Sequence, residues 1–324
     1  MDENRPVPVH RSVPGILLLD KPFGLSSNQA LQRARRCFGR PPAGHTGSLD
    51  PLATGMLPIC LGEATKIAGL LLGSRKSYLA DIGLGRRTAT GDAEGEPIEE
   101  RPVPQLSPSH VQKLLLAFVG SRQQKPPMYS AVHVGGERLY KLARQGIEVD
   151  RPARTIAIER IELIELGTAS LRIAVECSSG TYIRVLAEEI ALALGTVGFV
   201  SALRRVWVEP FAGEPLHTLD SLEALAAADP QDLAGLLLPI ERGLAGREAI
   251  ELDFERARRL SQGQAVAVTG QPGPRVVFGP GQRLLGLGEL GEDGRLKPRR
   301  LFSWAIDSKA CAQKDAVERD PGRG

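Results

Sequence analysis

The twelve residues from Gly44 to Gly55 limit the structure of this chain more than any other segment. They read G-H-T-G-S-L-D-P-L-A-T-G and hold a single carboxylate, Asp50. Gly44 and Gly47 permit backbone conformations that other residues resist, and Pro51 favours an extended conformation at Asp50. We therefore predict a non-helical loop that exposes Asp50. Because Gly, Ser, Asp and Pro are also common turn formers, the spacing alone is equally compatible with an ordinary turn.

Charge is unevenly distributed along the 324 residues. The 41 basic and 38 acidic side chains nearly balance, yet 21–49 holds five basic residues and no acidic one. In 120–145, five basic residues accompany Glu137 alone. Basic segments of this kind indicate a surface for a polyanion. A solvated basic surface is the alternative that local charge does not exclude.

Cysteine usage and hydropathy argue against several classes of protein. Cys37, Cys60, Cys177 and Cys311 are far apart and form no C-x-x-C pair, which argues against a zinc site or a disulfide framework and fits a reducing cytosol. No apolar run reaches the length of a membrane span, and the first residues lack a signal-peptide core. We expect a cytoplasmic protein without a membrane segment and without a metal.

Hydrophobic periodicity predicts alternating strands and helices. The expected strands lie at 16–19, 56–61, 78–84, 156–166 and 171–177. The expected helices begin at a cap on Ser27 or Asn28, at about residue 63, at a cap on Ser107 or Ser109, and at a cap on Thr181. Residues 86–100 are polar and acidic, and are expected to form a loop or a hairpin. After about residue 243, a helix at 254–260 and short strands at 265–268, 276–278 and 284–290 predict a small β-rich domain.

Arg184 falls in the first turn of the helix expected from Thr181 to Leu194. A cation is unfavourable there, because the helix dipole places partial positive charge at the N-terminus. A carboxylate or a phosphate opposite Arg184 would offset this cost. A solvated arginine on the helix surface is the alternative.

Five segments in order resemble those of one known family. They are D-K-P-F-G-L-S-S at Asp20–Ser27, the aspartate segment at Gly44–Lys66, K-S-Y at Lys76–Tyr78, P-P-M-Y-S-A-V at Pro126–Val132 and G-T-Y-I-R at Gly180–Arg184. Together they resemble the TruB family of bacterial tRNA pseudouridine-55 synthases, over a stretch from about residue 15 to 205. Two positions depart from the family pattern. Ser48 replaces the usual alanine, and Pro42 replaces a usual basic residue.

The resemblance implies an α+β pseudouridine-synthase fold. Its catalytic domain has a central, mainly antiparallel mixed sheet flanked by helices and loops, and a small β-rich PUA-like RNA-binding domain follows it. The expected boundaries are 14–245 for the catalytic domain, with a basic RNA-binding excursion at about 121–153, and 246–306 for the PUA-like domain. Residues 1–13 and 307–324 are expected to be a disordered lead-in and tail.

The resemblance also implies the catalytic residues. Asp50 matches the catalytic aspartate and Arg184 the arginine that pairs with it. Tyr78 matches the tyrosine that stacks on the target base and that is also implicated in removing the C5 proton late in the reaction. A nearby cation keeps a carboxylate ionised, and a carboxylate nucleophile can divide one difficult step into two. The implied reaction isomerises uridine-55 in the tRNA T-loop and needs no cofactor or metal. Attack of Asp50 on C1′, attack on C6 and assistance to a glycal route all remain open.

Further matches concern the RNA. Tyr182 matches a second active-site tyrosine and Leu203 an apolar residue of the pocket, although a core leucine is the simpler interpretation. His45 matches the histidine that fills the space left by the flipped base. Lys21 and Lys66 are expected against phosphates. The expected partner is the T-loop and T-stem of tRNA, bound by a monomer.

Three other functions are alternatives to the one that the resemblance implies. The first is a tRNA-binding or tRNA-folding protein without catalysis, which would not need Asp50, Tyr78, Tyr182 and Arg184 together. The second is a guide-RNA-dependent relative, which the P-P-M-Y-S-A segment and the K-L-A-R-Q-G run at 141–146 fit less well than the stand-alone enzyme. The third is a glycosidase, which requires a second catalytic carboxylate that no motif offers.

Overall fold

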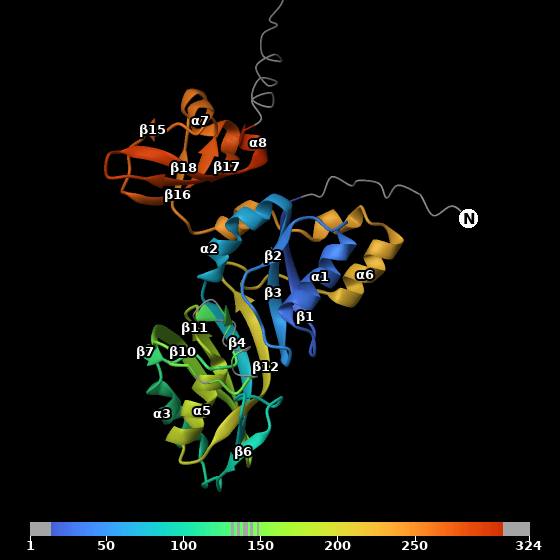
Figure 1. Ribbon diagram of the computed structural model, residues 1–324, viewed down its shortest axis with the longest axis vertical. Coiled ribbons are helices and arrows are strands. Elements are labelled where there is room, and N and C mark those ends of the chain that lie inside the picture. Colours follow the sequence, from blue (N-terminus) through green and yellow to red (C-terminus); the bar gives the residue numbers. More distant parts are fainter. Residues whose placement is uncertain are drawn as a thin grey trace, which may run out of the picture.

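The computed structural model describes residues 14–130, 133–134, 137–138, 142, 145–147 and 149–306. The lead-in at 1–13, the tail at 307–324 and part of the basic excursion at 121–153 lie outside the described residues. A central sheet and a smaller C-terminal sheet are visible in Figure 1 as separate bodies. None of the helices in the described ranges is long and apolar enough to cross a membrane.

The central sheet is mixed and mainly antiparallel, as expected. Its strand order is β13-β1-β3-β12-β4-β11-β10-β7, and β2 pairs with β3. Only the β1–β13 and β3–β12 pairs are parallel among its ladders. The strands span β1 Gly15–Lys21, β2 Ala43–His45, β3 Ala53–Leu61, β4 Lys76–Leu84, β7 Gly120–Gln124, β10 Arg154–Leu166, β11 Ser170–Cys177, β12 Gly198–Val208 and β13 His217–Thr218.

Helices cover the two ends of this sheet (Figure 1). Apolar side chains of α1 and α6 pack with those of β1 and β3 in one core. Side chains of α3 and α5 pack with those of β4, β10 and β11 in another. The helices span α1 Ser27–Cys37, α2 Ala68–Leu72, α3 Pro108–Leu116, α5 Ile183–Ala193 and α6 Leu219–Ala228, with 3₁₀ helices at η1 Gly62–Ile67, η2 Asp232–Leu236 and η3 Ile240–Leu244.

Two expected helix caps are wrong. Ser26 caps α1 and forms a reciprocal capping box with Gln29, whereas the Ser27 hydroxyl bonds the backbone of Leu49. Helix α5 begins at Ile183 without a side-chain cap. The Thr181 hydroxyl instead donates to the Ser178 carbonyl at 3.0 Å. At α1 a tertiary contact with Leu49 takes the Ser27 hydroxyl, and at α5 a local contact three residues earlier takes the Thr181 hydroxyl.

Strand β12 lies in the middle of the sheet but was not expected. Its sequence, G-F-V-S-A-L-R-R-V-W-V, places Arg204 and Arg205 side by side, and two register irregularities interrupt its pairing with β4. A bulge breaks the strict alternation that identifies a strand from sequence. The expected helix at 63–72 is also divided, into η1 and α2.

Short hairpins form small two-stranded sheets outside the central sheet. The polar segment after β4 forms the hairpin of β5 Arg86–Thr88 and β6 Pro97–Glu100, in agreement with one of the two expected forms. Strands β8 His133–Val134 and β9 Glu137–Arg138 pair within the basic excursion.

The C-terminal domain is β-rich, as expected. Its sheet has the order β14-β16-β17-β18-β15. Its elements are β14 Ala249–Glu251, α7 Phe254–Ser261, β15 Val266–Ala267, β16 Gly273–Gly279, η4 Pro280–Gln282, β17 Arg283–Leu290, β18 Arg295–Leu301 and α8 Ser303–Ile306. Val276, Leu284 and Phe302 share a core with Ile67 and Leu71, so the two sheets are joined by apolar packing.

Gly55 is required where β3 meets β12. It has a φ of +98°, and a Cβ at this position would overlap the backbone of Arg205. Gly44 has no such neighbour, because nothing lies within 4 Å of the corresponding position. The two glycines at the ends of the Asp50 segment therefore allow a controlled comparison of alanine substitutions with and without a steric clash.

We predict that Gly55→Ala lowers the free energy of unfolding by about 2–4 kcal/mol, because it combines backbone strain with overpacking. Gly44→Ala should change it by less than about 1 kcal/mol. Urea unfolding followed by circular dichroism measures both. Equal losses in the two variants would contradict the steric argument.

Candidate active site

The loop that carries Asp50 is held from several directions. Gly44 and His45 pair with β3, and the amide of Thr46 donates to the Pro58 carbonyl at 3.0 Å. The Leu49 amide donates to the Ser27 hydroxyl at 2.7 Å, which ties the loop to the start of α1. The segment is non-helical, as its glycines and proline predict. Its position is set by neighbours from distant parts of the chain.

A buried arginine pairs with the Asp50 carboxylate. Arg184 Nε lies 3.0 Å from Asp50 Oδ2, and the arginine side chain is only 6% exposed. Arg184 Nη1 lies 3.6 Å from Asp92 Oδ2 and donates to the Thr90 carbonyl at 2.7 Å. Arg184 Nη2 donates to the Tyr129 carbonyl at 2.6 Å. The guanidinium group is thus fixed by backbone carbonyls and shared by two carboxylates.

This arrangement sets the ionisation of Asp50. Burial raises the pKa of the Asp50 carboxyl, the Arg184 guanidinium lowers it, and the Asp92 carboxylate raises it again, so that it ends above its ordinary value. Removing a carboxylate from water disfavours its charged form, and a nearby cation favours it. Arg184 therefore favours the ionised form of Asp50, whose side chain is 41% exposed, and Asp92 disfavours it.

Asp92 was not predicted from the sequence. It lies in the acidic hairpin segment between β5 and β6, far from Asp50 in the chain, and no motif marks it. Its hydrogen bonds with the Thr90 hydroxyl and the Glu94 amide are local. Only the fold brings it to Arg184.

A cavity of about 580 Å³ adjoins the ion pair. Five of the expected site residues line it, namely Asp50, Tyr78, Tyr182, Arg184 and Leu203. Further polar residues also line it, among them Lys76, Ser130 and Arg205, which no motif marked as site residues. Its size is that of a small-molecule pocket.

Tyr78 forms part of the apolar wall. Its side chain is buried with Leu203 in the core that includes Leu49. Burial raises the pKa of the Tyr78 phenol, and the nearby Arg205 lowers it in part. The phenol is therefore protonated near neutral pH.

Arg205 and Lys76 place two buried cations at the same cavity. Arg205 Nε donates to the Met56 carbonyl at 2.7 Å, and its Nη2 donates to the Gly47 carbonyl at 3.1 Å. Burial, and secondarily Arg205, lower the pKa of Lys76 to about 8. The basic doublet at 204–205 and the lysine of K-S-Y were the available sequence signals, but neither distinguishes a cavity residue from a surface one.

Three expected RNA contacts lie outside the cavity wall. The Lys21 side chain is fully buried, and Lys66 Nζ pairs with Glu63 at 2.8 Å and donates to the Leu301 carbonyl at 2.9 Å. Contact with a phosphate does not fit the Lys21 amine, because it is fully buried and bonded to protein oxygens. The Lys66 side chain is 30% exposed, so its contact with a phosphate stays a prediction. His45 lies in β2, where burial and the nearby Arg205 lower its pKa.

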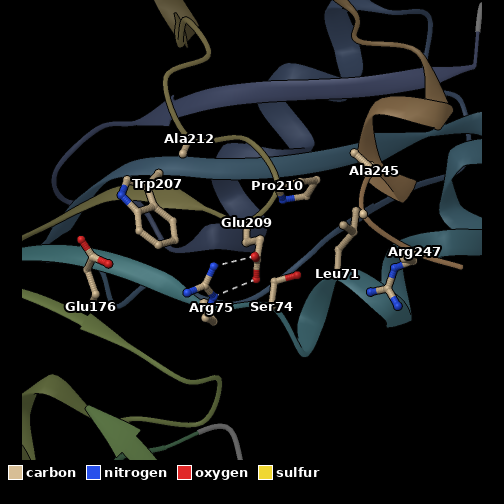
Figure 2. A pocket seen from close by; sticks show the side chains of 12 residues that line it. Leu71, Ser74, Arg75, Glu176, Trp207, Glu209, Pro210, Ala212, Ala245 and Arg247 are labelled. Carbon is tan, nitrogen blue, oxygen red and sulfur yellow. Dashed lines mark hydrogen bonds and ion pairs between the residues drawn. The ribbon is translucent and has the colours of Figure 1, made fainter. Parts of the chain in front are cut away.

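A second cavity, of about 630 Å³, lies at the ends of β4 and β12 (Figure 2). Trp207 and Arg247 line it, and none of the expected site residues does. Arg75 in its wall is neutralised by two partners, Glu209 at 2.8 Å and Glu159 at 2.7 Å. The Asp50 cavity is therefore the better candidate for chemistry. No cluster of three or more potential metal ligands occurs within the described ranges.

Family models match the chain in three consecutive parts. The model described as TruB family pseudouridylate synthase (N terminal domain) matches residues 35–183. The model for the tRNA pseudouridylate synthase B C-terminal domain matches residues 184–245. The model for Pseudouridine synthase II TruB, C-terminal, matches residues 249–302.

Curated relatives align over nearly the whole chain. The tRNA pseudouridine synthase B of Xanthomonas axonopodis pv. citri is 51% identical over 310 residues, covering 95% of this chain and 100% of the relative. That of Nitrosococcus oceani is 49% identical over 294 residues, covering 90% of this chain and 96% of the relative.

Solved structures share the fold at lower identity. A structure of an H/ACA RNP bound to a substrate RNA containing 2′-deoxyuridine has a TM-score of 0.68 and 21% identity, covering 89% of this chain and 84% of its own. An archaeal box H/ACA sRNP complex also has a TM-score of 0.68 and 21% identity, with coverages of 93% and 90%. The α+β fold expected from the sequence is thereby confirmed.

We predict that Asp92→Asn lowers the pKa of Asp50, because it removes the negative charge that raises this pKa. The amide oxygen of asparagine can still accept the hydrogen bonds that Asp92 Oδ1 accepts. Titration of ¹³C-labelled aspartate carboxyls by NMR measures the shift. Asp81→Asn, at a surface carboxylate paired with Arg172, is the control and should leave Asp50 unchanged. An Asp50 pKa that stays constant or rises in Asp92→Asn would contradict the electrostatic account.

Proposed function

Because the chain belongs to the TruB family of pseudouridylate synthases, we propose that it converts uridine-55 in the T-loop of tRNA into pseudouridine. The observation that carries this proposal is the ion pair between the buried Arg184 and the half-buried Asp50 beside a cavity of about 580 Å³. A carboxylate that an arginine orients at such a cavity can act on a nucleoside that has left its stack. Flipping the nucleotide out of the stack costs a few kcal/mol.

The isomerisation needs no change in overall composition. The C1′–N1 bond breaks with its electron pair on the uracil, the base rotates, and C5 bonds to C1′. The C5 proton then leaves and N1 gains a proton. The ionised Asp50 starts this sequence by attack on C1′, by attack on C6 or by assistance to a glycal route. In each case Arg184 supplies the charge that keeps Asp50 reactive.

Tyr78, Tyr182 and Leu203 line the cavity and are suited to hold the base. We assign Tyr78 the stacking position. Its raised pKa keeps the phenol protonated, so it is less suited to remove the C5 proton directly. His45 is assigned to the space that the flipped base leaves in the RNA.

The RNA surface extends beyond the cavity. We infer a catalytic domain at 14–245 and a PUA-like RNA-binding domain at 246–306. Exposed cations on two elements of the latter support this: Arg256, Arg258 and Arg259 on α7, and Arg295, Lys297, Arg299 and Arg300 on β18. We further infer that the protein acts as a monomer in the cytoplasm.

The relatives of about 50% identity favour a stand-alone enzyme. Each is named tRNA pseudouridine synthase B and is matched along almost its full length. The H/ACA structures share only 21% of the aligned residues, so they support the fold and not a guide RNA. We therefore retain the stand-alone tRNA enzyme over a guide-dependent or purely RNA-binding protein.

We predict that Asp50→Asn abolishes pseudouridine formation and still binds tRNA, because it removes the carboxylate charge while it keeps the side-chain shape. Tritium release from C5-labelled tRNA transcript, without a guide RNA, measures the reaction. Filter binding measures the affinity. Asp81→Asn is the matched control and should keep full activity. An active Asp50→Asn enzyme would refute the catalytic assignment.

We predict that affinity for tRNA falls at least about tenfold between 50 and 200 mM salt, because bound phosphates release counterions. Arg300→Gln should weaken binding and reduce the salt dependence. Arg160→Gln, at an ion-paired surface position on β10, should not. A tRNA affinity that does not change with salt would contradict the electrostatic contribution to binding. If the affinity of Arg300→Gln depends on salt as steeply as that of the parent, Arg300 does not contact the RNA.

A further inference from the structure

Phe23 is the most exposed large hydrophobic side chain among the residues for which exposure is described. It is 71% exposed, in the D-K-P-F-G turn between β1 and α1. Full burial of a phenylalanine side chain stabilises a protein by roughly 1.5–3 kcal/mol. Because the Phe23 ring is mostly exposed, it gains little of this stabilisation in the folded protein.

The turn beneath the ring is fixed by a buried ammonium group. Lys21 Nζ donates to the carbonyls of Leu25 at 2.5 Å, Pro22 at 2.9 Å and Pro51 at 3.3 Å. Pro22 and Leu25 lie on either side of Phe23 in the chain. Since the Lys21 side chain is fully buried, loss of any of these bonds would leave a polar group unsatisfied. Lys21 therefore holds the turn in place rather than contacting a phosphate.

The same contacts join the turn to the catalytic loop. Gly24, at a φ of +82°, donates its amide to the Pro51 carbonyl at 2.8 Å. Pro51 directly follows Asp50, and Phe23 directly precedes Gly24. Phe23 is thus adjacent in the chain to a residue whose backbone is bonded to the Asp50 loop. It is not part of the cavity wall, so it lies outside the space for the reacting nucleoside.

An exposed ring on a turn that is bonded to the Asp50 loop suits a nucleobase. Base–aromatic stacking is worth about 1–3 kcal/mol per base and tolerates every base, because each has a π face. A protein partner is a poorer fit. Specific protein interfaces bury more than about 1,000 Å², whereas the other members of this turn, Pro22, Gly24 and Leu25, add little apolar surface.

We propose that Phe23 stacks on a base of the substrate RNA that neighbours the nucleoside held at Asp50. Lys21 acts as its positioning residue by fixing the turn. This inference rests on the proposed function, since it requires an RNA whose target nucleoside enters the Asp50 cavity.

The first test compares Phe23→Ala with Phe23→Tyr on a T-arm RNA transcript. We expect Phe23→Ala to lower kcat/KM and the binding affinity by roughly 5- to 100-fold, which corresponds to the loss of one stacked base. Phe23→Tyr should stay within about twofold of the parent, because the ring is kept. The control is Leu116→Ala, at an exposed apolar residue of α3, which should have no effect. Full activity and affinity in Phe23→Ala would overturn the proposal.

The second test identifies the stacked base. A set of transcripts carries one abasic nucleotide each, at the positions around the target uridine. For one position, the parent protein should bind the abasic RNA more weakly than the intact RNA. Phe23→Ala should bind these two RNAs equally, because it has already lost the stacking contact. If Phe23→Ala loses the same factor in affinity, relative to the parent, for the intact RNA and for every abasic RNA, Phe23 has only a structural role and the proposal is overturned.

The two tests separate this inference from the proposed function. If the parent protein forms no pseudouridine, the proposed function fails, and the binding comparison still decides the role of Phe23. If the parent is active and Phe23→Ala matches it in rate and affinity, only the role of Phe23 fails. A change of Phe23→Ala in sedimentation instead of RNA affinity would point to a second copy of the chain and would also overturn it.

Discussion

The ion pair between Arg184 and Asp50 is the interaction on which the site depends. The guanidinium group is almost fully buried, and its donors meet the carbonyls of Thr90 and Tyr129 as well as two carboxylates. A buried charge is tolerated only when its partners are complete, because an unpaired ion in the interior is costly. Partners for the Arg184 guanidinium group, which lies at the start of α5, come from the segment at Asp92, the P-P-M-Y-S segment and the Asp50 loop.

Buried cations organise the surroundings in a similar way. Arg205 reaches from β12 to the carbonyls of Met56 and Gly47, and Lys21 reaches from β1 to that of Pro51. Each fixes loop backbone that glycine and proline leave without regular hydrogen bonds. These hydrogen bonds hold the Asp50 loop against side chains of the sheet. The Lys21 contacts also hold the turn after β1 that carries the exposed Phe23, which links this turn to the Asp50 loop.

Part of the site could be predicted from the sequence. The Asp50 segment, the K-S-Y segment with Tyr78 and the G-T-Y-I-R segment with Arg184 are contiguous motifs, and the cation at a helix start indicated a negative partner, with a solvated arginine as the alternative. Asp92 has no motif, and it joins the site only through the chain path between β5 and β6. Lys21 and Lys66 were expected on the RNA surface, because sequence shows a charge but not whether carbonyls or another carboxylate already satisfy it.

For the fold, hydrophobic periodicity predicted five of the nine strands of the central sheet and three of the five strands of the C-terminal sheet. Composition indicated a loop or a hairpin after β4 and a β-rich domain after about residue 243. Strand β12 escaped prediction, since its bulges and its two arginines disrupt the alternation, although it lies at the centre of the sheet. Local residue types decided which segments bend and which extend, because these preferences act over a few residues. Only the tertiary structure decided which hydroxyl caps a helix, which amine is buried and which carboxylates share Arg184, because those choices depend on groups that are distant in the chain.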